Sequence, residues 1–348
     1  MIRIPFFSRN IGVDLGTSNI LIYLDKRGIV INEPSIVAFN TKTGKLLAVG
    51  EEAKKMLGRT PAHIQVIRPL VNGVISDFEM SQEILRHFLR KLAKQGSFMS
   101  YGKAIVGVPS NLTEVERKSV EDAVMGAGVF QPYVIDEPLA AAIGARLPID
   151  EAIASMIVDI GGGTTEIAII SMAGTVTSKS LKVAGDKLTD DILRFVREEF
   201  KLAVGEATAE EIKLAIGSAI PLDQKLEMNI RGRDMVSGLP KEIVIRDTQV
   251  RAAIAKSLRS IVEAIREVLE IAPPELAGDI LKRGINICGG GSLLRGIDQL
   301  ISKELSVATM VIEDPLTCVA RGTGVVIENL THYENLLDNP LRPKEIKL

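Results

Sequence analysis

The sequence predicts an α/β protein of two related halves, each with a mixed β-sheet flanked by helices. Two observations carry this prediction. Short apolar strand segments alternate along the chain with stretches of helical spacing, which is typical of mixed or parallel sheets. One unit also occurs twice, near Asp14 and near Asp159: an apolar strand, an Asp, a Gly-Thr turn and a second apolar strand. This repetition indicates an internal duplication.

The composition describes a folded chain and excludes several classes of protein. Of 348 residues, 46% are hydrophobic and 25% are charged, which excludes wholesale disorder. A net charge of −2 with only 4% aromatic residues argues against a nucleic-acid partner. Two Cys exclude a disulfide scaffold, and the scattered His and Cys show no metal-ligand spacing. The best apolar stretch, residues 167–178, is too short to cross a bilayer, so we expect a cytoplasmic protein.

The first half contains four expected strands and three expected helices. Gly16 and Asn19 allow a tight reversal between the first two strands. The helix after Thr113 has Glu116 placed to complete a capping box. The strands are expected over residues 11–13, 20–24, 104–108 and 134–135, and the helices over residues 81–94, 113–125 and 139–145.

The second half repeats this alternation. Its longest expected helix has apolar residues at helical spacing until Pro273 and Pro274 stop it. Strands are expected over residues 156–158, 167–170 and 285–287, and helices over residues 189–200, 208–216 and 250–271.

Three Gly-rich turns, each directly after an expected buried strand, are the candidate functional sites. They follow Asp14, Asp159 and Cys288. Turns without Cβ atoms let backbone N–H groups approach phosphate oxygens closely. An Asp just before such a turn can hold Mg²⁺, usually through waters. Asp14 and Asp159 could also be turn caps, since most Gly-rich turns only reverse the chain. The sequence contains no P-loop motif and no G-x-G-x-x-G, so neither of those nucleotide sites is supported.

Several longer stretches, together with these turns, carry a family resemblance. They are Gly28-Ile29-Val30-Ile31-Asn32-Glu33-Pro34-Ser35, Gly58-Arg59-Thr60-Pro61, Ile67-Arg68-Pro69-Leu70, Asp136-Glu137-Pro138-Leu139-Ala140-Ala141-Ala142 and Pro273-Pro274-Glu275-Leu276. The chain resembles the actin, heat-shock chaperone and sugar kinase superfamily. Within it, the chain is most similar to the MreB family of bacterial actins over about residues 11–330, with the paralogous Mbl proteins as an alternative. The resemblance implies an actin-like ATPase fold with the nucleotide in the cleft between the halves.

The resemblance also implies a role for each matching position. Asp14 and Asp159 would order waters around Mg²⁺, and Glu137, assisted by the Thr164 hydroxyl, would activate the attacking water in a slow hydrolysis of ATP. ATP would contact Gly16, Thr17, Ser18, Asn19, Gly161, Gly162, Gly163, Thr164, Glu210, Lys213, Gly289, Gly290 and Gly291. Glu137 could instead be a helix N-cap carboxylate, and Glu210 with Lys213 an ordinary exposed pair. Cys288, where relatives often carry Thr, is expected to be a buried small residue, as is Cys318.

Further positions are expected to face lipid or a second copy of the chain. Apolar residues near the N-terminus and in one loop would bind the inner face of the cytoplasmic membrane: Ile2, Ile4, Phe6, Phe7, Phe98 and Met99. Val115 would lie where antiparallel protofilaments pair through the helix at 113–125. The alternatives are a disordered terminus and plain core packing of Val115.

The expected function is that of an ATP-dependent, membrane-associated homopolymer. It would organise cell-wall elongation, with membrane-bound elongation proteins as partners, and so maintain rod shape. A small-molecule kinase of the same superfamily is the main alternative, followed by a scaffold that binds nucleotide without hydrolysis. The expected domains are a membrane-binding segment at 1–10, a first half at 11–150 with a small subdomain at about 32–75, a second half at 151–335 with a small subdomain at about 186–250, and a polar tail at 336–348.

Overall fold

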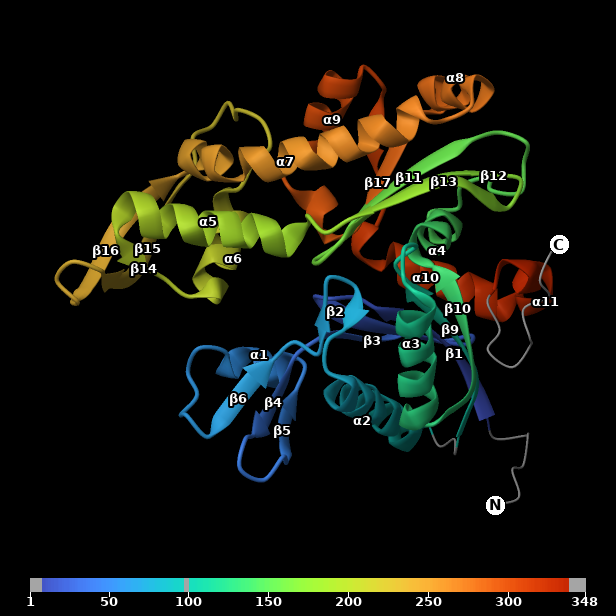
Figure 1. The fold of residues 1–348 in the computed structure, drawn as a ribbon, viewed down its shortest axis with the longest axis horizontal. Coiled ribbons are helices and arrows are strands. Elements are labelled where there is room, and N and C mark those ends of the chain that lie inside the picture. The colour runs from blue at the N-terminus through green and yellow to red at the C-terminus, as the bar shows by residue number, and fades with distance from the viewer. Residues whose placement is uncertain (1–7, 97–99, 338–348) are drawn as a thin grey trace. The chain divides into compact units, whose positions relative to one another are not determined.

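The computed structural model describes residues 8–96 and 100–337, which form two compact units (Figure 1). Among these residues, the first unit contains those up to Ala152, Ile170–Thr175 and those from Thr317 onward. The second unit contains Ile153–Ile169 and Val176–Leu316. The chain therefore returns, near its end, to the unit in which it starts.

The first unit is built on a five-stranded mixed sheet with the order β10-β9-β1-β2-β3. The first strand, β1, pairs antiparallel with β2 and parallel with β9. The strands are β1 (Ser8–Leu15), β2 (Asn19–Leu24), β3 (Gly28–Pro34), β9 (Ser100–Val108) and β10 (Val129–Asp136). A smaller sheet, β5-β4-β6, accompanies it with helix α1, and β7 pairs with β8. Their bounds are β4 (Val37–Asn40), β5 (Leu46–Val49), α1 (Glu51–Met56), β6 (Ile64–Ile67), β7 (Leu70–Val71) and β8 (Val74–Ile75).

Helices cover both faces of this sheet, and the side chains of β1 show why. Alternate residues of a strand point to opposite faces. Ile11 and Val13 join the core that contains Phe88 of helix α2, whereas a Cβ at Gly12 would lie 2.4 Å from Thr323 Oγ1 of helix α10. Helix α10 can approach the sheet closely because small residues face it. The helices of this unit are α2 (Phe78–Gly96), α3 (Glu114–Ala127), α4 (Glu137–Gly144), α10 (Cys318–Glu328) and α11 (Leu330–Tyr333).

The predicted capping box at the start of α3 is confirmed. Thr113 Oγ1 accepts a hydrogen bond from the Glu116 amide at 3.3 Å, and the Glu116 carboxylate accepts one from the Thr113 amide at 2.8 Å. Two otherwise unsatisfied amide groups of the first turn are thereby paired.

The second unit has a five-stranded sheet with the order β13-β12-β11-β17-β18. The strands are β11 (Ser155–Ile160), β12 (Thr165–Ser171), β13 (Gly174–Leu181), β17 (Ile285–Cys288) and β18 (Thr309–Val311). A three-stranded sheet accompanies it, made of β14 (Leu202–Ala203), β15 (Glu227–Asp234) and β16 (Pro240–Arg246). The helices are α5 (Gly185–Phe200), α6 (Glu206–Ile216), α7 (Asp247–Glu270), α8 (Pro274–Arg283) and α9 (Ile297–Leu305).

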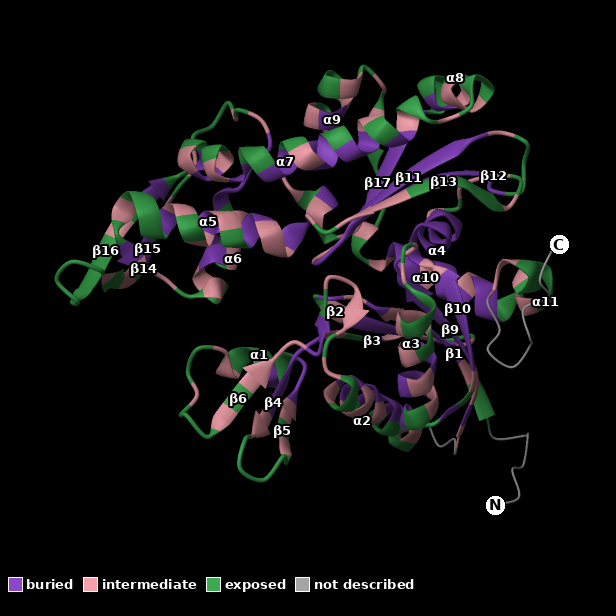
Figure 2. Cartoon of the chain, in the orientation of Figure 1, coloured by how far each residue is buried: buried purple, intermediate pink, exposed green. Residues whose placement is uncertain are grey.

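The two large sheets have the same plan, which confirms the predicted fold class. In each sheet, the strand before the Gly-Thr turn is central, with the next two strands of the chain on one side and two later strands on the other. Central strand β11 is buried along its whole length, and β1 is buried at Ile11, Gly12, Val13 and Leu15 (Figure 2). No helix among the described residues combines the length and the apolar character needed to cross a bilayer.

The structure differs from the predicted elements in the start of two helices and in several elements that were not predicted. Helix α5 begins at Gly185 rather than at residue 189, and α4 begins at Glu137, so Pro138 lies inside its first turn. Helices α1, α8, α9, α10 and α11 lie where no helix was predicted. The other predicted helices and strands are present, with ends displaced by a few residues.

Candidate functional site

The first Gly-Thr turn joins β1 to β2 and carries Gly16, Thr17 and Ser18. The carbonyl oxygen of Gly16 accepts a hydrogen bond from Ser35 Oγ. Since the C=O and the following N–H of a trans peptide point in opposite directions, the Thr17 amide points away from Ser35. Thr17 Oγ1 accepts from the Gly73 amide at 3.0 Å, which leaves the hydroxyl hydrogen available to donate. A Cβ at Gly16 would lie 2.6 Å from Asn19 O, so this turn requires glycine.

The second turn, between β11 and β12, is closed by a hydrogen bond from the Gly161 amide to Thr164 O at 2.9 Å. Two of its carbonyl groups face the start of α5. Gly161 O accepts from the Gly185 amide at 3.1 Å, and Gly162 O accepts from the Asp186 amide at 2.8 Å. By the same peptide geometry, the amides of Gly162 and Gly163 point away from α5. Two successive amides with this orientation suit an anionic ligand.

Asp14 and Asp159 occupy equivalent positions, each near the end of its central strand. Asp159 is 8% exposed, and burial together with the nearby Glu166 carboxylate raises its pKa to about 7. The Cys288 thiol, opposite Asp159 in the β11–β17 register, opposes this rise by hydrogen bonding to the carboxylate. Cys288 and Cys318 are both buried, as predicted, but the side chain of Cys288 also makes a specific contact with Asp159.

Glu137 is the first residue of α4 and is 8% exposed. The residue before it, Asp136, is the N-cap by backbone geometry but makes no side-chain capping bond. Its carboxylate instead forms an ion pair with Arg117 of α3 at 2.8 Å. The end of β10 and the start of α4 are thereby tied to α3, and this places Glu137 in a defined, largely buried position.

Glu210 and Lys213 form an ion pair at 2.7 Å on α6. Lys213 Nζ also donates to Gly185 O and to Thr189 Oγ1, both at 2.9 Å, and Thr189 hydrogen bonds to Glu210. The Lys213 side chain is only 12% exposed. The alternative of an ordinary exposed pair is therefore wrong, because these residues brace α6 against the first turn of α5. Thr189, which lies on α5, was not among the predicted site residues.

The third Gly-rich turn follows β17 and continues into a 3₁₀ turn, Gly290–Leu293. Gly289 has a φ of 77°, and a Cβ there would lie 2.2 Å from Asp159 Oδ1. A Cβ at Gly291 would lie 2.3 Å from Ile160 Cγ2. Both glycines are thus required by packing against the end of β11, and this places the turn directly beside Asp159.

The remaining predicted positions divide into two groups. Val115 lies on the first turn of α3 and is 79% exposed, so plain core packing of this residue is wrong. The six positions predicted to bind the membrane lie outside the described residues: Ile2, Ile4, Phe6, Phe7, Phe98 and Met99.

The outward amides of each Gly-Thr turn suit an anionic group such as a phosphate. In the described part of the chain, no three His, Cys, Asp or Glu side chains gather into a metal-binding group. Asp14 and Asp159 each lie shortly before a turn whose amides point outward. A cation held there would need other oxygen ligands, such as phosphate and water, which is how Mg²⁺ commonly binds in proteins.

A family model described as MreB/Mbl protein matches residues 8–335. The cell shape-determining protein Mbl of Bacillus subtilis (strain 168) is 49% identical over 324 residues, which cover 93% of this chain and 97% of that protein. The cell shape-determining protein MreB of Escherichia coli (strain K12) is 45% identical over 326 residues, which cover 92% of this chain and 94% of that protein.

Two solved structures extend these similarities to the fold. MreB5 of Spiroplasma citri bound to ADP superposes with a TM-score of 0.90 at 38% identity, covering 95% of this chain and 99% of that one. A MamK double helical filament superposes with a TM-score of 0.78 at 23% identity, covering 92% and 99%. The second likeness concerns the fold alone.

Proposed function

Because the chain belongs to the MreB/Mbl family and has the actin-like fold, we propose that it binds ATP, hydrolyses it slowly and polymerises. The polymer would be an antiparallel double filament on the inner face of the cytoplasmic membrane. There it would organise cell-wall elongation, together with membrane-bound elongation proteins, and so maintain rod shape.

The main support for ATP binding is the repeated Gly-Thr turn. In both copies, backbone amides point away from the elements that hold the turn. We assign the β- and γ-phosphates of one ATP to the two turns, Gly16 to Asn19 and Gly161 to Thr164. MreB5 of Spiroplasma citri has been solved bound to ADP and to AMPPNP, which supports nucleotide binding by this chain. The nucleoside is assigned to Glu210, Lys213 and the turn from Gly289 to Gly291.

Asp14 and Asp159 would hold the waters of a Mg²⁺ ion, which supplies positive charge against the phosphates. Burial of Asp159 suits this role, because a cation relieves the cost of a buried carboxylate.

Glu137 would orient or deprotonate the attacking water, assisted by the Thr164 hydroxyl. Both side chains are nearly buried, so each is held in few orientations. Phosphoryl transfer requires mainly positioning and charge stabilisation. A single carboxylate therefore suffices for slow turnover.

Val115 supports pairing of protofilaments through α3, because a large apolar side chain at 79% exposure is available to a second copy of the chain. Membrane binding is assigned to the apolar segment before Ser8 and to Phe98 with Met99. Burying two Phe and two Ile would contribute several kcal/mol at about 1.5–3 kcal/mol each. A filament would add avidity by presenting many copies.

The test is electron microscopy of the purified protein on a lipid monolayer with ATP and Mg²⁺. We expect paired filaments on the lipid with ATP and none when nucleotide is removed. A protein that stays monomeric under these conditions, yet phosphorylates a member of a sugar panel, would instead be a kinase of the superfamily.

A second experiment isolates the membrane contact. Removing Met1–Phe7 and changing Phe98 and Met99 to Ser should abolish co-sedimentation with liposomes while filaments still form in solution. Undiminished binding by this variant would refute the assigned lipid-facing residues.

A further inference from the structure

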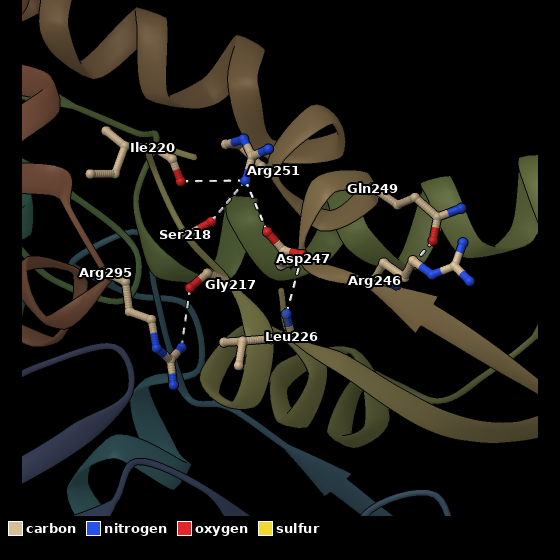
Figure 3. A network of polar contacts seen from close by, with 9 residues as sticks. All are labelled: Gly217, Ser218, Ile220, Leu226, Arg246, Asp247, Gln249, Arg251 and Arg295. Atoms are coloured by element: carbon tan, nitrogen blue, oxygen red, sulfur yellow. Dashed lines mark hydrogen bonds and ion pairs between the residues drawn. The ribbon is translucent and has the colours of Figure 1, made fainter. Parts of the chain in front are cut away.

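Two arginines from different elements converge on the segment that follows α6 (Figure 3). Arg295, between the 3₁₀ turn and α9, donates from Nη1 to Leu214 O and to Gly217 O, both at 3.1 Å. Arg251 of α7 donates to Ser218 Oγ and Ile220 O, both at 3.3 Å, and pairs with Asp247 at 3.1 Å. The end of α6 is thus fixed by side chains from outside the helix.

The contacts of Arg295 are those that the end of a helix needs. The last carbonyl groups of a helix have no partner within it, and a cation there also interacts favourably with the helix dipole. Leu214 lies in the last turn of α6, and Gly217 is its C-cap. A Cβ at Gly217 would lie 2.3 Å from Lys213 O, so the chain must turn tightly at this point. A planar guanidinium can serve both carbonyl groups at once, which a lysine ammonium does less well.

Arg295 also connects two parts of the proposed nucleoside site, helix α6 and the third Gly-rich turn. Leu214 directly follows Lys213, and Arg295 comes shortly after Gly291 on the segment that leaves the third Gly-rich turn. The main chain repeats the connection, because the Ala219 amide donates to Arg295 O at 2.8 Å. Arg295 therefore sets the position of α6, with Glu210 and Lys213, relative to the Gly289–Gly291 turn.

We propose that Arg295 is a positioning residue for the nucleoside of ATP, which it affects through α6 without touching the ligand. This inference rests on the proposed function. The amides that face the phosphates are held by strands and by the start of α5, and Arg295 contacts neither. Loss of Arg295 should therefore weaken binding of the nucleoside and leave binding of the phosphates largely intact.

The variants for the test are Arg295→Ala and Arg295→Lys, with Arg266→Ala as the matched control. Arg266 Nη2 donates to Glu304 O at 3.1 Å near the end of α9, so it makes the same kind of contact in the same unit, away from α6. Arg295 is itself solvent-exposed, so truncation opens no cavity in the core. Affinities for ATP and for inorganic tripolyphosphate are measured on each protein, with the melting temperature recorded alongside.

We expect Arg295→Ala to raise the Kd for ATP about tenfold and the Kd for tripolyphosphate less than twofold, with the turnover of bound ATP unchanged. Arg295→Lys should recover part of the ATP affinity, and Arg266→Ala should change neither Kd. Equal changes for both ligands in Arg295→Ala, or no change in either, would overturn the positioning role. Failure of the unaltered protein to bind ATP would instead refute the proposed function.

Discussion

Replacing Gly322 with Ala should force α10 away from α4. A Cβ at Gly322 would lie 1.8 Å from Ala140 O, and a Cβ at Gly144 on the facing helix would lie 1.9 Å from Cys318 O. Cβ atoms essentially never lie within 3.0 Å of a non-bonded heavy atom. The Ala140 carbonyl and residue 322 must therefore move apart by more than about 1 Å. Both contacts involve backbone, and no change of rotamer can relieve them.

Two opposing effects determine how much Gly322→Ala changes the stability of the protein. Ala favours a helix interior over Gly by about 1 kcal/mol, whereas overpacking a close-packed contact costs about 1–3 kcal/mol and occasionally more. The α4 residues Ala140, Ala141 and Ala142 are all fully buried, so the movement spreads into the core. At the upper end of that range, Gly322→Ala should destabilise the first unit by about 2 kcal/mol.

Gly278 provides the matched control, because it also lies within a helix, α8, but a Cβ there would meet no atom within 4 Å. Gly278→Ala should stabilise the protein by about 0.5–1 kcal/mol. The assay is urea unfolding followed by circular dichroism, read as the midpoint of the transition because a chain of two units has no single unfolding free energy. The midpoints should move in opposite directions. If Gly322→Ala raises the midpoint as Gly278→Ala does, the close crossing of α4 and α10 is wrong.

Three further predictions concern single contacts. Thr113→Ala removes the capping oxygen of α3 and should lower stability by about 1 kcal/mol in urea unfolding; an unchanged midpoint would contradict the capping box. Asp247→Ala leaves the half-buried Arg251 without its carboxylate and should cost about 2–3 kcal/mol, seen as a lower urea midpoint; an unchanged midpoint would contradict this. Burial and the hydrogen bond to Glu328 raise the pKa of Tyr23 from 10.0 to about 12, so the neutral phenol stabilises the fold fully below pH 10 and progressively less as the pH rises to 12. The difference in melting temperature between the natural protein and Tyr23→Phe should therefore narrow between pH 9 and pH 11.5, and a constant difference would refute the Tyr23 pKa.

Elements with a strong local pattern were predictable from the sequence. The capping box of α3 needs only Thr113 and Glu116, which are three residues apart and interact within one turn. The two Gly-Thr hairpins were recognised because each combines apolar strands with a turn that only small residues allow. Their duplication then predicted two sheets of the same plan.

Helix α10 could not be predicted in this way. Its sequence contains Gly322 and Gly324 together with β-branched residues, all weak helix formers. The helix forms because it packs on α4 and on the sheet, where Gly12 and Gly322 permit a close approach. These contacts join residues that are far apart in the sequence, so no local window contains the signal.

The candidate site, too, was predictable only where a local sequence motif marked it. Its turns and acidic residues were marked by the motifs themselves. The partners that hold the turns were not, because Ser35 and Gly185 reach them from other elements. The β15–β16 hairpin was also missed, although alternating apolar residues around Ile230 and a turn containing Gly238 could have indicated it.

The role of Glu137 in hydrolysis is tested by measuring both phosphate release and ATP affinity of the Glu137→Ala variant. The first turn of α4 is predicted to supply the carboxylate that activates water, whereas ATP is held by the turns. Phosphate release should therefore fall by about 100-fold or more, while the Kd for ATP stays within about threefold of the natural protein's. Phosphate release at the unaltered rate would contradict the account of hydrolysis.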